Sequence, residues 1–401
     1  MKKISSTALV LLTIILMDLL TGMEFDLFVP SFPQLQAEFS LTPFWVEALI
    51  SINFLGYCIS LFVVGSLADR YGRKHIILLG LGIFAIGSIL CLWAPCYFAL
   101  LLGRFLHGIG IAAPAILSFL IIADSYPLKQ QQVFMAMMNG AMNLAVAVSP
   151  LLGSYITFYY HWKGNFATLL GLSLIALFMA ILFIPKHNLP EHKEDAALFD
   201  YMPLFKSKTL MQMMAHITFM IVPYWIFVGM SPLLYMKSFG VSIEHFGYYQ
   251  GALALFFAFG SISFGFIINR FERKKTLFVT NQIFILSFLT VACVTWINSA
   301  NPLLITIAFI PFVIAQIIPS TILYPLCLNF MPKAKGRVSA MIVGSCLILC
   351  ALSLQLAGFV YRGSFQHIGM IILPFILMSV FTLFKVIKNE EVMNYGKVQP
   401  E

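Results

Sequence analysis

Charged residues are scarce in this chain of 401 residues: they make up 10% of it, whereas hydrophobic residues make up 60%. A soluble domain averages about 25% charged and about 45–50% apolar residues, so the composition excludes an ordinary soluble protein and indicates a polytopic membrane protein. The formal net charge of +8 could suggest a nucleic-acid partner. The cations are spread over many short loops, however, and we expect no nucleic acid to bind.

Cysteine is also sparse, and its seven residues are an odd number that lie in or near apolar segments without metal-ligand spacing. We therefore expect free apolar thiols and no disulfide framework or metal site. The sequence shows no cluster of a nucleophile with a base and no phosphate-binding loop, so we expect neither an enzyme nor a cofactor. The apolar run after Met1 lacks a small-residue cleavage site and carries acids, which favours a retained first helix over a signal peptide.

Long apolar runs dominate the rest of the chain, and a helix needs about 20 such residues to cross a membrane. We expect an all-α integral membrane protein with twelve spans, at residues 8–30, 44–67, 75–94, 98–123, 133–157, 166–185, 210–236, 246–269, 276–298, 302–325, 337–361 and 364–386. The long polar stretch at 186–209 divides them. This pattern predicts six-helix halves at 1–185 and 210–401, joined by a cytoplasmic linker.

The loop cations predict the orientation, because cytoplasmic loops carry an excess of Lys and Arg. On the predicted spans, only Lys163, Lys237 and Arg362 fall on one side, and Arg104 falls inside a span. The remaining Lys and Arg residues lie on the other side. Both termini are therefore expected to be cytoplasmic.

The ten residues GSLADRYGRK, at 65–74, stand between two apolar spans. We expect its two glycines to supply positive φ for a tight turn. The run resembles the loop between the second and third helices of the Major Facilitator Superfamily, G-x-x-x-D-R-x-G-R-[KR]. The resemblance implies a gating role on the cytoplasmic side for the matching residues Gly65, Asp69, Arg70, Gly72, Arg73 and Lys74.

A second copy, GFIINRFERKK, lies two hundred residues further on, at 265–275. It keeps a glycine and the cations Arg270, Arg273 and Lys274 in register, while Asn269 replaces Asp69. A repeat at that spacing implies two halves of similar architecture. Carriers of this superfamily consist of two six-helix halves with the substrate site at their interface.

The first span contains Asp18, Glu24 and Asp26. An ionisable side chain near the bilayer centre costs about 2.5–3.5 kcal/mol on insertion scales, so such residues are functional candidates by default. At about 100° per residue, Asp18 and Asp26 lie roughly 80° apart around the helix, whereas Glu24 lies about 160° from Asp26. Pro30 and Pro33 make a break near the outer end of this helix plausible. We take all three acids as proton-coupling candidates.

The fourth span contains RFLHGIGIAAP, residues 104–114, which places Arg104 and His107 on one helix face with Gly108 and Gly110 available for close packing. It resembles the R-x-x-x-G-x-G pattern of proton-coupled carriers in the superfamily, in which the Arg faces the central cavity. We expect Arg104 to pair with an acid of the first helix, Asp26 being the first choice. A permanent structural ion pair is the alternative. The second half has no carboxylate within a span, so titrating groups are expected in the first half.

The fifth span carries Ser149, Pro150, Gly153 and Ser154 where exporters of the superfamily carry G-P-x-x-G-G. We assign Pro150 and Gly153 to gating, because Pro bends a helix and small residues allow close approach. The runs DLFVPSFPQL at 26–35 and EHFGYYQGAL at 244–253 resemble the Bcr/CflA drug-resistance branch. That branch implies proton-driven efflux of amphipathic compounds across the bacterial inner membrane.

The resemblance also implies that the first, fourth, seventh and tenth helices line the cavity. The substrate-binding candidates are Asp26, Arg104, His107, Tyr224, Trp225 and Gln316. We therefore expect a proton-coupled multidrug exporter that works by alternating access and can act as a monomer. Alternatives are a dedicated exporter of one metabolite, such as a siderophore, a polyamine or an amino acid derivative, and an importer by symport, which the Pro150 region disfavours.

Overall fold

The computed structural model describes residues 2–125, 128–185, 202–267, 271–331 and 335–394, and these residues are almost wholly helical. The chain divides into two compact units. Unit 1 holds Met1–Leu198 together with Val241–Gly251, and unit 2 holds Phe199–Gly240 with Ala252–Glu401. The expected linker at 186–209 falls mostly outside the described residues.

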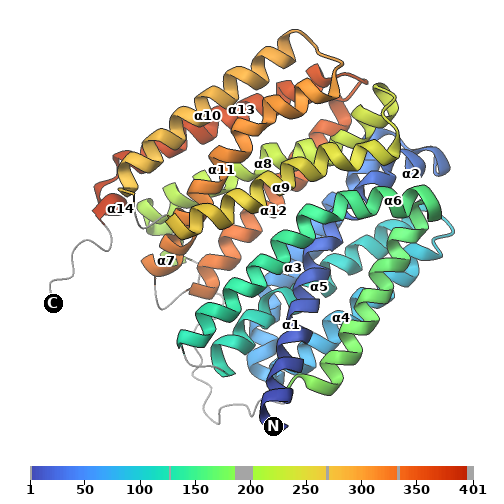
Figure 1. Ribbon diagram of the computed structural model, residues 1–401, viewed down its shortest axis with the longest axis vertical. Coiled ribbons are helices and arrows are strands. Elements are labelled where there is room, and N and C mark those ends of the chain that lie inside the picture. Colours follow the sequence, from blue (N-terminus) through green and yellow to red (C-terminus); the bar gives the residue numbers. More distant parts are fainter. Residues whose placement is uncertain (1, 126–127, 186–201, 268–270, 332–334, 395–401) are drawn as a thin grey trace. The chain divides into compact units, whose positions relative to one another are not determined.

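Unit 1 consists of α1 (Lys2–Asp26), the short turn η1 (Val29–Ser31), α2 (Phe32–Glu38), α3 (Pro43–Tyr71), α4 (Arg73–Leu92), α5 (Tyr97–Ser125) and α6 (Leu128–Phe183). Within it, α1 packs along α6, while α3 and α4 both pack against α5 (Figure 1). This arrangement places α1, α3, α4 and α5 around one another, and the buried polar groups described below lie between them.

Unit 2 consists of α7 (Met202–Lys206), α8 (Lys208–Pro232), the π-helical turn η2 (Leu233–Ser238), most of α9 (Ile243–Ile267), α10 (Arg273–Trp296), α11 (Pro302–Phe330), α12 (Lys335–Val360), α13 (Phe365–Lys388) and α14 (Glu390–Asn394). Helix α8 packs against α11, α12 and α13, and α10 packs against α11 and α13 (Figure 1). Helix α11 is continuous through Pro311, Pro319 and Pro325, so the prolines of the tenth span do not break it.

In the described part of the chain, ten helical stretches are long and apolar enough to cross a membrane, by length and composition. One of them, Gly140–Phe183, has 44 residues, about 66 Å of helix, which is twice the thickness of a hydrocarbon core. It is interrupted at His161, whose φ of 57° and ψ of −176° are not helical. With α6 counted as two crossings and the 25-residue α9 added, the helices agree with the twelve expected spans.

The break in α6 frees backbone groups, and Gln34 of α2 takes them up. Its Oε1 accepts a hydrogen bond from the Trp162 backbone N at 2.9 Å, and its Nε2 lies 3.5 Å from the Thr157 carbonyl oxygen. A side-chain amide here stands in for the missing helical hydrogen bonds. The short helix α2 is thereby attached to the turn between the two halves of α6.

The loop at 65–74 is more helical than expected. Helix α3 continues to Tyr71, so Gly65 is a helical residue, and the expectation that it supplies positive φ was wrong. Gly72 alone makes the turn, with φ of 87°, and its backbone N donates to the Ala68 carbonyl. A glycine just past a helix end is the usual way to stop a helix in the left-handed region.

Candidate functional site: a buried charge cluster in unit 1

Helix α1 buries all three of its acids inside the protein, with exposed fractions of 1% for Asp18, 0% for Glu24 and 2% for Asp26. The helix ends at Asp26, and Pro30 stands at the start of the turn that follows. The helix break predicted from the prolines is therefore present. It leaves Glu24 and Asp26 in the last turn of α1.

Arg104 on α5 pairs with Glu24: its Nη1 lies 2.7 Å from Glu24 Oε1, and both side chains are fully buried. The expectation that Asp26 would be the partner was wrong. Glu24 lies on the opposite side of α1 from Asp26, and that side faces the α5 helix position from which Arg104 extends. Glu24 also has the longer side chain.

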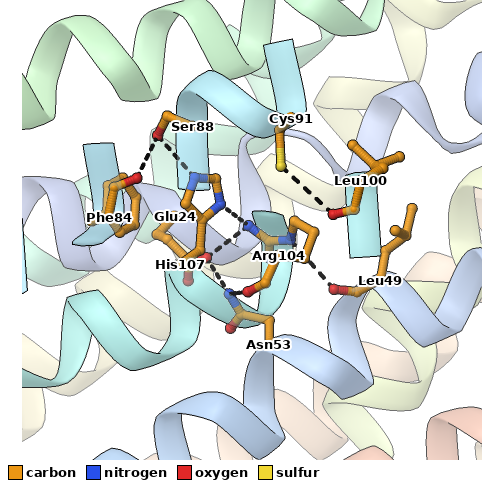
Figure 2. A network of polar contacts seen from close by, with 9 residues as sticks. All are labelled: Glu24, Leu49, Asn53, Phe84, Ser88, Cys91, Leu100, Arg104 and His107. Atoms are coloured by element: carbon orange, nitrogen blue, oxygen red, sulfur yellow. Dashed lines mark hydrogen bonds and ion pairs between the residues drawn. The ribbon is translucent and has the colours of Figure 1, made fainter. Parts of the chain in front are cut away.

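Three further contacts hold Arg104 in place. Its Nε lies 3.3 Å from the Leu49 carbonyl oxygen of α3, and its Nη1 lies 3.0 Å from His107 Nδ1 (Figure 2). The guanidinium carbon stands 4.1 Å from the centroid of the Phe28 ring. A cation over an aromatic face is favourable, and more so away from water.

Asn53 of α3 completes the cluster. Its Nδ2 donates to Glu24 Oε1 at 2.6 Å and lies 3.1 Å from the Arg104 carbonyl oxygen (Figure 2). Glu24 Oε1 thus accepts from two helices at once, and α1, α3 and α5 meet at this atom. Asn53 is not among the site residues that the sequence predicted.

The cluster leaves several polar atoms open. Among the described residues, Glu24 Oε2, Arg104 Nη2, Asn53 Oδ1 and one carboxylate oxygen each of Asp18 and Asp26 are buried without a hydrogen-bond partner. Buried polar groups are nearly always paired, so each exception calls for an explanation. The donor Arg104 Nη2 and the acceptor Glu24 Oε2 can each form a new hydrogen bond while the contact between Nη1 and Oε1 is still in place.

Close approach of α5 to its neighbours depends on glycine. A Cβ on Gly108 would overlap the backbone of Asn53 on α3, and a Cβ on Gly103 would lie 2.8 Å from the Gly87 carbonyl oxygen on α4. Small residues that let two backbones meet are typical of membrane helix interfaces. The prediction that Gly108 serves close packing is confirmed, and this packing brings Arg104 within reach of α1.

His107, expected to be a substrate-binding residue, is fully buried. Its ring is stacked on Phe84 of α4 with centroids 4.3 Å apart, and its Nε2 lies 2.8 Å from Ser88 Oγ. Both ring nitrogens are therefore taken up by protein partners. Ser88 was not singled out in the sequence, because a serine in an apolar span carries no signal of its own.

The other substrate-binding candidates lie in unit 2. Tyr224 and Trp225 on α8 are half-buried, with ring centroids 6.3 Å apart, and Gln316 on α11 is 7% exposed. His216 on α8 is buried, and its Nδ1 lies 3.1 Å from both the Ser379 carbonyl oxygen and Thr382 Oγ1 of α13. It therefore holds two helices of this unit together.

Sequence reasoning missed Glu47. It lies on α3, is fully buried, and neither of its carboxylate oxygens has a hydrogen-bond partner among the described residues. The rule that flagged the acids of α1 applies equally to an acid in an apolar span. Its position near the start of the second span made it resemble a loop residue.

Two gating candidates of the 65–74 motif, Arg73 and Lys74, bind backbone carbonyls near the C-terminal ends of other helices. Arg73 donates to the Leu120 carbonyl of α5, and Lys74 Nζ lies 2.7 Å from the carbonyl oxygens of Ile181 and Ile184. Cations suit the C-terminal carbonyls of a helix. The guanidinium of Arg70 stands over the Tyr71 ring at 5.4 Å. The side chain of Asp69 lies outside the described residues.

The second copy of the motif makes a parallel contact. Arg273 Nη1 lies 2.7 Å from the Val392 carbonyl oxygen of α14.

The gating candidates on α6 lie where α1 ends. A Cβ on Gly153 would overlap the Leu27 carbonyl, and Ser154 Oγ donates to the Pro150 carbonyl at 2.9 Å. Helix α6 runs through Pro150 without a break; its interruption lies further on, at His161.

Known proteins resemble the chain in sequence and in fold. Multidrug resistance protein MdtL of Klebsiella pneumoniae subsp. pneumoniae is 23% identical over 270 residues, which cover 65% of this chain and 67% of that protein. Chloramphenicol resistance protein CraA of Acinetobacter baumannii is 25% identical over 350 residues, covering 85% and 84%. The crystal structure of a D-xylose-proton symporter superposes with a TM-score of 0.76 over 95% of this chain and 97% of that one, at 14% identity.

The family model of the Major Facilitator Superfamily matches residues 14–354, which include the buried cluster and both copies of the loop motif. The matched part runs through most of both units. The family expected from the 65–74 motif is thus confirmed, and the chain belongs to the Major Facilitator Superfamily.

Proposed function

We propose that this protein is a proton-coupled secondary transporter that exports small amphipathic compounds across the bacterial inner membrane by alternating access. The buried Glu24–Arg104 pair, with its open Oε2 and Nη2 atoms, carries this proposal. It stands beside Asp18 and Asp26 in unit 1, which holds every buried acid within a span among the residues that the structure describes. The resistance proteins to which the chain is similar support drugs as the cargo.

Protons act in the proposed cycle by changing the partners of Arg104. An Arg cannot lose its proton in a protein, so the carboxylates must titrate. A proton arriving from outside neutralises Asp26 or Asp18 and so reduces the negative charge that α1 presents to the guanidinium, which weakens the contact between Arg104 and α1. Arg104 Nη2 then engages another acceptor, and the carrier turns inward. Substrate entering from the cytoplasm displaces the proton, and the pair reforms.

Two residues are proposed as the proton acceptor. One is Asp26, which lies two residues from Glu24, and the other is Asp18, which lies about two turns before Asp26. Neither Asp26 nor Asp18 has a cation among the partners described for it, so both are available to take up a proton. Glu24, already paired, would set the charge that the titrating acid experiences. Both termini are proposed to lie in the cytoplasm, and the monomer suffices for this cycle.

The test uses the full chain in proteoliposomes with a pH-sensitive dye inside. A proton gradient is imposed, and ethidium, chloramphenicol or spermidine is added. We expect ethidium and chloramphenicol each to trigger proton movement in the wild type, and Asp26→Asn to reduce it at least tenfold at equal protein level. Ser118→Ala, a buried change on α5 that removes no hydrogen bond described for it, is the matched control.

Three results would contradict parts of the proposal. A response to spermidine alone would point to a dedicated polycation exporter, for which the α1 acids would serve as ligands. Full coupling in both Asp26→Asn and Asp18→Asn would remove these acids from the proton pathway. No proton movement with any of the three compounds would contradict proton-coupled drug export.

A further inference from the structure

The hydrogen bonds around His107 form a chain that runs from α4 to α1 (Figure 2). Ser88 Oγ donates to the Phe84 carbonyl at 3.1 Å and lies 2.8 Å from His107 Nε2. His107 Nδ1 lies 3.0 Å from Arg104 Nη1, which also donates to Glu24 Oε1 at 2.7 Å. Each of these side chains is fully buried.

The position of every proton in this chain follows from the guanidinium. Arg has five N–H donors and no acceptor, so His107 Nδ1 must be the acceptor and carries no hydrogen. The hydrogen of the neutral ring is then on Nε2 and points to Ser88 Oγ, whose own hydrogen is used on the Phe84 carbonyl. A second proton on the ring would set an N–H and a positive charge against the guanidinium at 3.0 Å.

We propose that His107 is a positioning residue that stays neutral through the cycle and keeps Arg104 in place when Glu24 releases it. Nη1 is shared between Glu24 and His107, and Nε lies at the Leu49 carbonyl. When the Glu24 contact weakens, the contacts to His107 and Leu49 remain, because neither partner is an acid. Arg104 therefore stays on α5, and the open Nη2 is presented at a fixed point. The effect of His107 on transport rests on the proposed function.

The charged and titratable groups around the ring are consistent with this role. Arg104 lies on the same helix as His107, and Glu24 and Asp26 lie at the end of α1. The Cys91 thiol of α4 is directed to another partner, the Leu100 carbonyl oxygen, at 3.7 Å. Helix α3 contributes the uncharged amide of Asn53. Helix α6 contributes the ring of Phe166, whose centroid lies 6.0 Å from that of His107. No acid contacts the ring itself among these groups, so nothing favours a second proton on it.

The packing fixes the ring as well as its protons. Phe84 covers one face, and a Cβ on Gly87 would lie 2.9 Å from His107 Cδ2. The ring thus fills the space that the glycine leaves between α4 and α5. A hydrogen-bond acceptor that cannot move away is what an anchor for a buried cation requires.

The first test reads the protons directly and does not depend on transport. The full chain with ¹⁵N-labelled histidine is prepared in lipid bilayers, and the signals of His107 are assigned from their loss in His107→Asn. We expect an unprotonated Nδ1 and a protonated Nε2, unchanged between about pH 5 and pH 8. The exposed His75 gives the comparison signal in the same sample. A proton on Nδ1, or a doubly protonated ring, in the folded protein would overturn the proposal.

The second test compares two variants that separate the acceptor from the ring. In His107→Asn the Oδ1 atom occupies the place of Nδ1 and can accept from Arg104, whereas His107→Phe keeps the stack on Phe84 and loses the acceptor. We expect the pH midpoint of coupled ethidium transport to rise by about one unit in His107→Phe, which is tenfold in proton affinity. His107→Asn and the control Ser118→Ala should keep the wild-type midpoint.

The midpoint rises because a loosely held guanidinium stabilises the ionised acids of α1 less well. An unchanged midpoint in folded His107→Phe, or an equal rise in His107→Asn, would overturn the proposal. If the wild type transports nothing, the proposed function fails, and the nitrogen signals of the first test still decide the state of His107.

Discussion

Glu24 and Asp26 are two residues apart in the last turn of α1, yet they have different surroundings. Glu24 is bound by an Arg and an Asn from two other helices. Asp26 has a buried oxygen without a partner among the described residues. A buried ion pair is costly to desolvate and is weak support for stability by itself. Its presence beside a less well-partnered acid fits a site where partners are exchanged.

Replacing Glu24 by Leu should destabilise the protein by roughly 3–5 kcal/mol, because Arg104 is left as an uncompensated buried charge. Adding Arg104→Met should restore most of the loss, since a buried pair replaced by apolar residues of similar volume is often neutral. Unfolding of the two variants and the wild type in detergent micelles measures both steps. If the single variant were as stable as the double one, the pair would not be a buried charge pair in the folded protein.

Glu47→Gln should leave folding unchanged within about 1 kcal/mol. An unpaired buried carboxylate is too costly to keep charged, so we expect Glu47 to carry a proton, and Gln has nearly the same shape as the protonated acid. Glu47→Lys, which brings a charge to the same place, should lower the yield of folded protein sharply. Size-exclusion profiles and thermal unfolding compare the three chains. A large loss in Glu47→Gln would mean that Glu47 carries a negative charge with a partner.

At the scale of the elements, α5 is the helix that the cluster depends on. It provides Arg104 and His107, and its glycines let α3 and α4 approach closely enough to hold both side chains. Helix α1 contributes the acids, and its end is fixed by the contact of the Leu27 carbonyl with Gly153 of α6. The geometry of the cluster is thus a consequence of helix separation as much as of the charged residues.

Gly108→Ala should destabilise unit 1 by about 1–3 kcal/mol, because the new methyl group overlaps the backbone of Asn53 and forces α3 away. Gly82→Ala on α4 is the matched control, since a Cβ there meets nothing within 4 Å. That control should be neutral or slightly stabilising, because Ala is the better helix former by about 1 kcal/mol. Thermal unfolding compares the stability of the two variants. Equal stability of Gly108→Ala and Gly82→Ala would contradict the close contact of α5 with α3.

For the whole molecule, the distribution of charge predicts the orientation in the membrane. The Lys- and Arg-rich ends of the helices, including the 65–74 motif, are proposed to face the cytoplasm. Cys96 stands at the opposite end, in the turn between α4 and α5, and its side chain is exposed. Its thiol can therefore report which end of the helices faces outward.

Cys96 should react with a membrane-impermeant maleimide added outside intact cells, in a Cys293→Ser background that removes the other exposed thiol. Tyr71→Cys in a background that also carries Cys96→Ser places a thiol at an exposed position of the loop motif, and it should react only after the cells are permeabilised. A gel shift after labelling measures the reactivity of both thiols. Reversed accessibility would overturn the proposed orientation.

The apolar runs and the repeat determined the helical membrane fold and the family, because a membrane demands about 20 apolar residues per crossing whatever the tertiary structure. The acids of α1 and Arg104 also followed from sequence, since charges in apolar spans are few enough to be singled out. The choice of Glu24 over Asp26 did not, because it depends on which face of α1 meets α5. The same holds for Ser88, Asn53 and Glu47: only packing tells whether a polar residue in a span is buried, and against what.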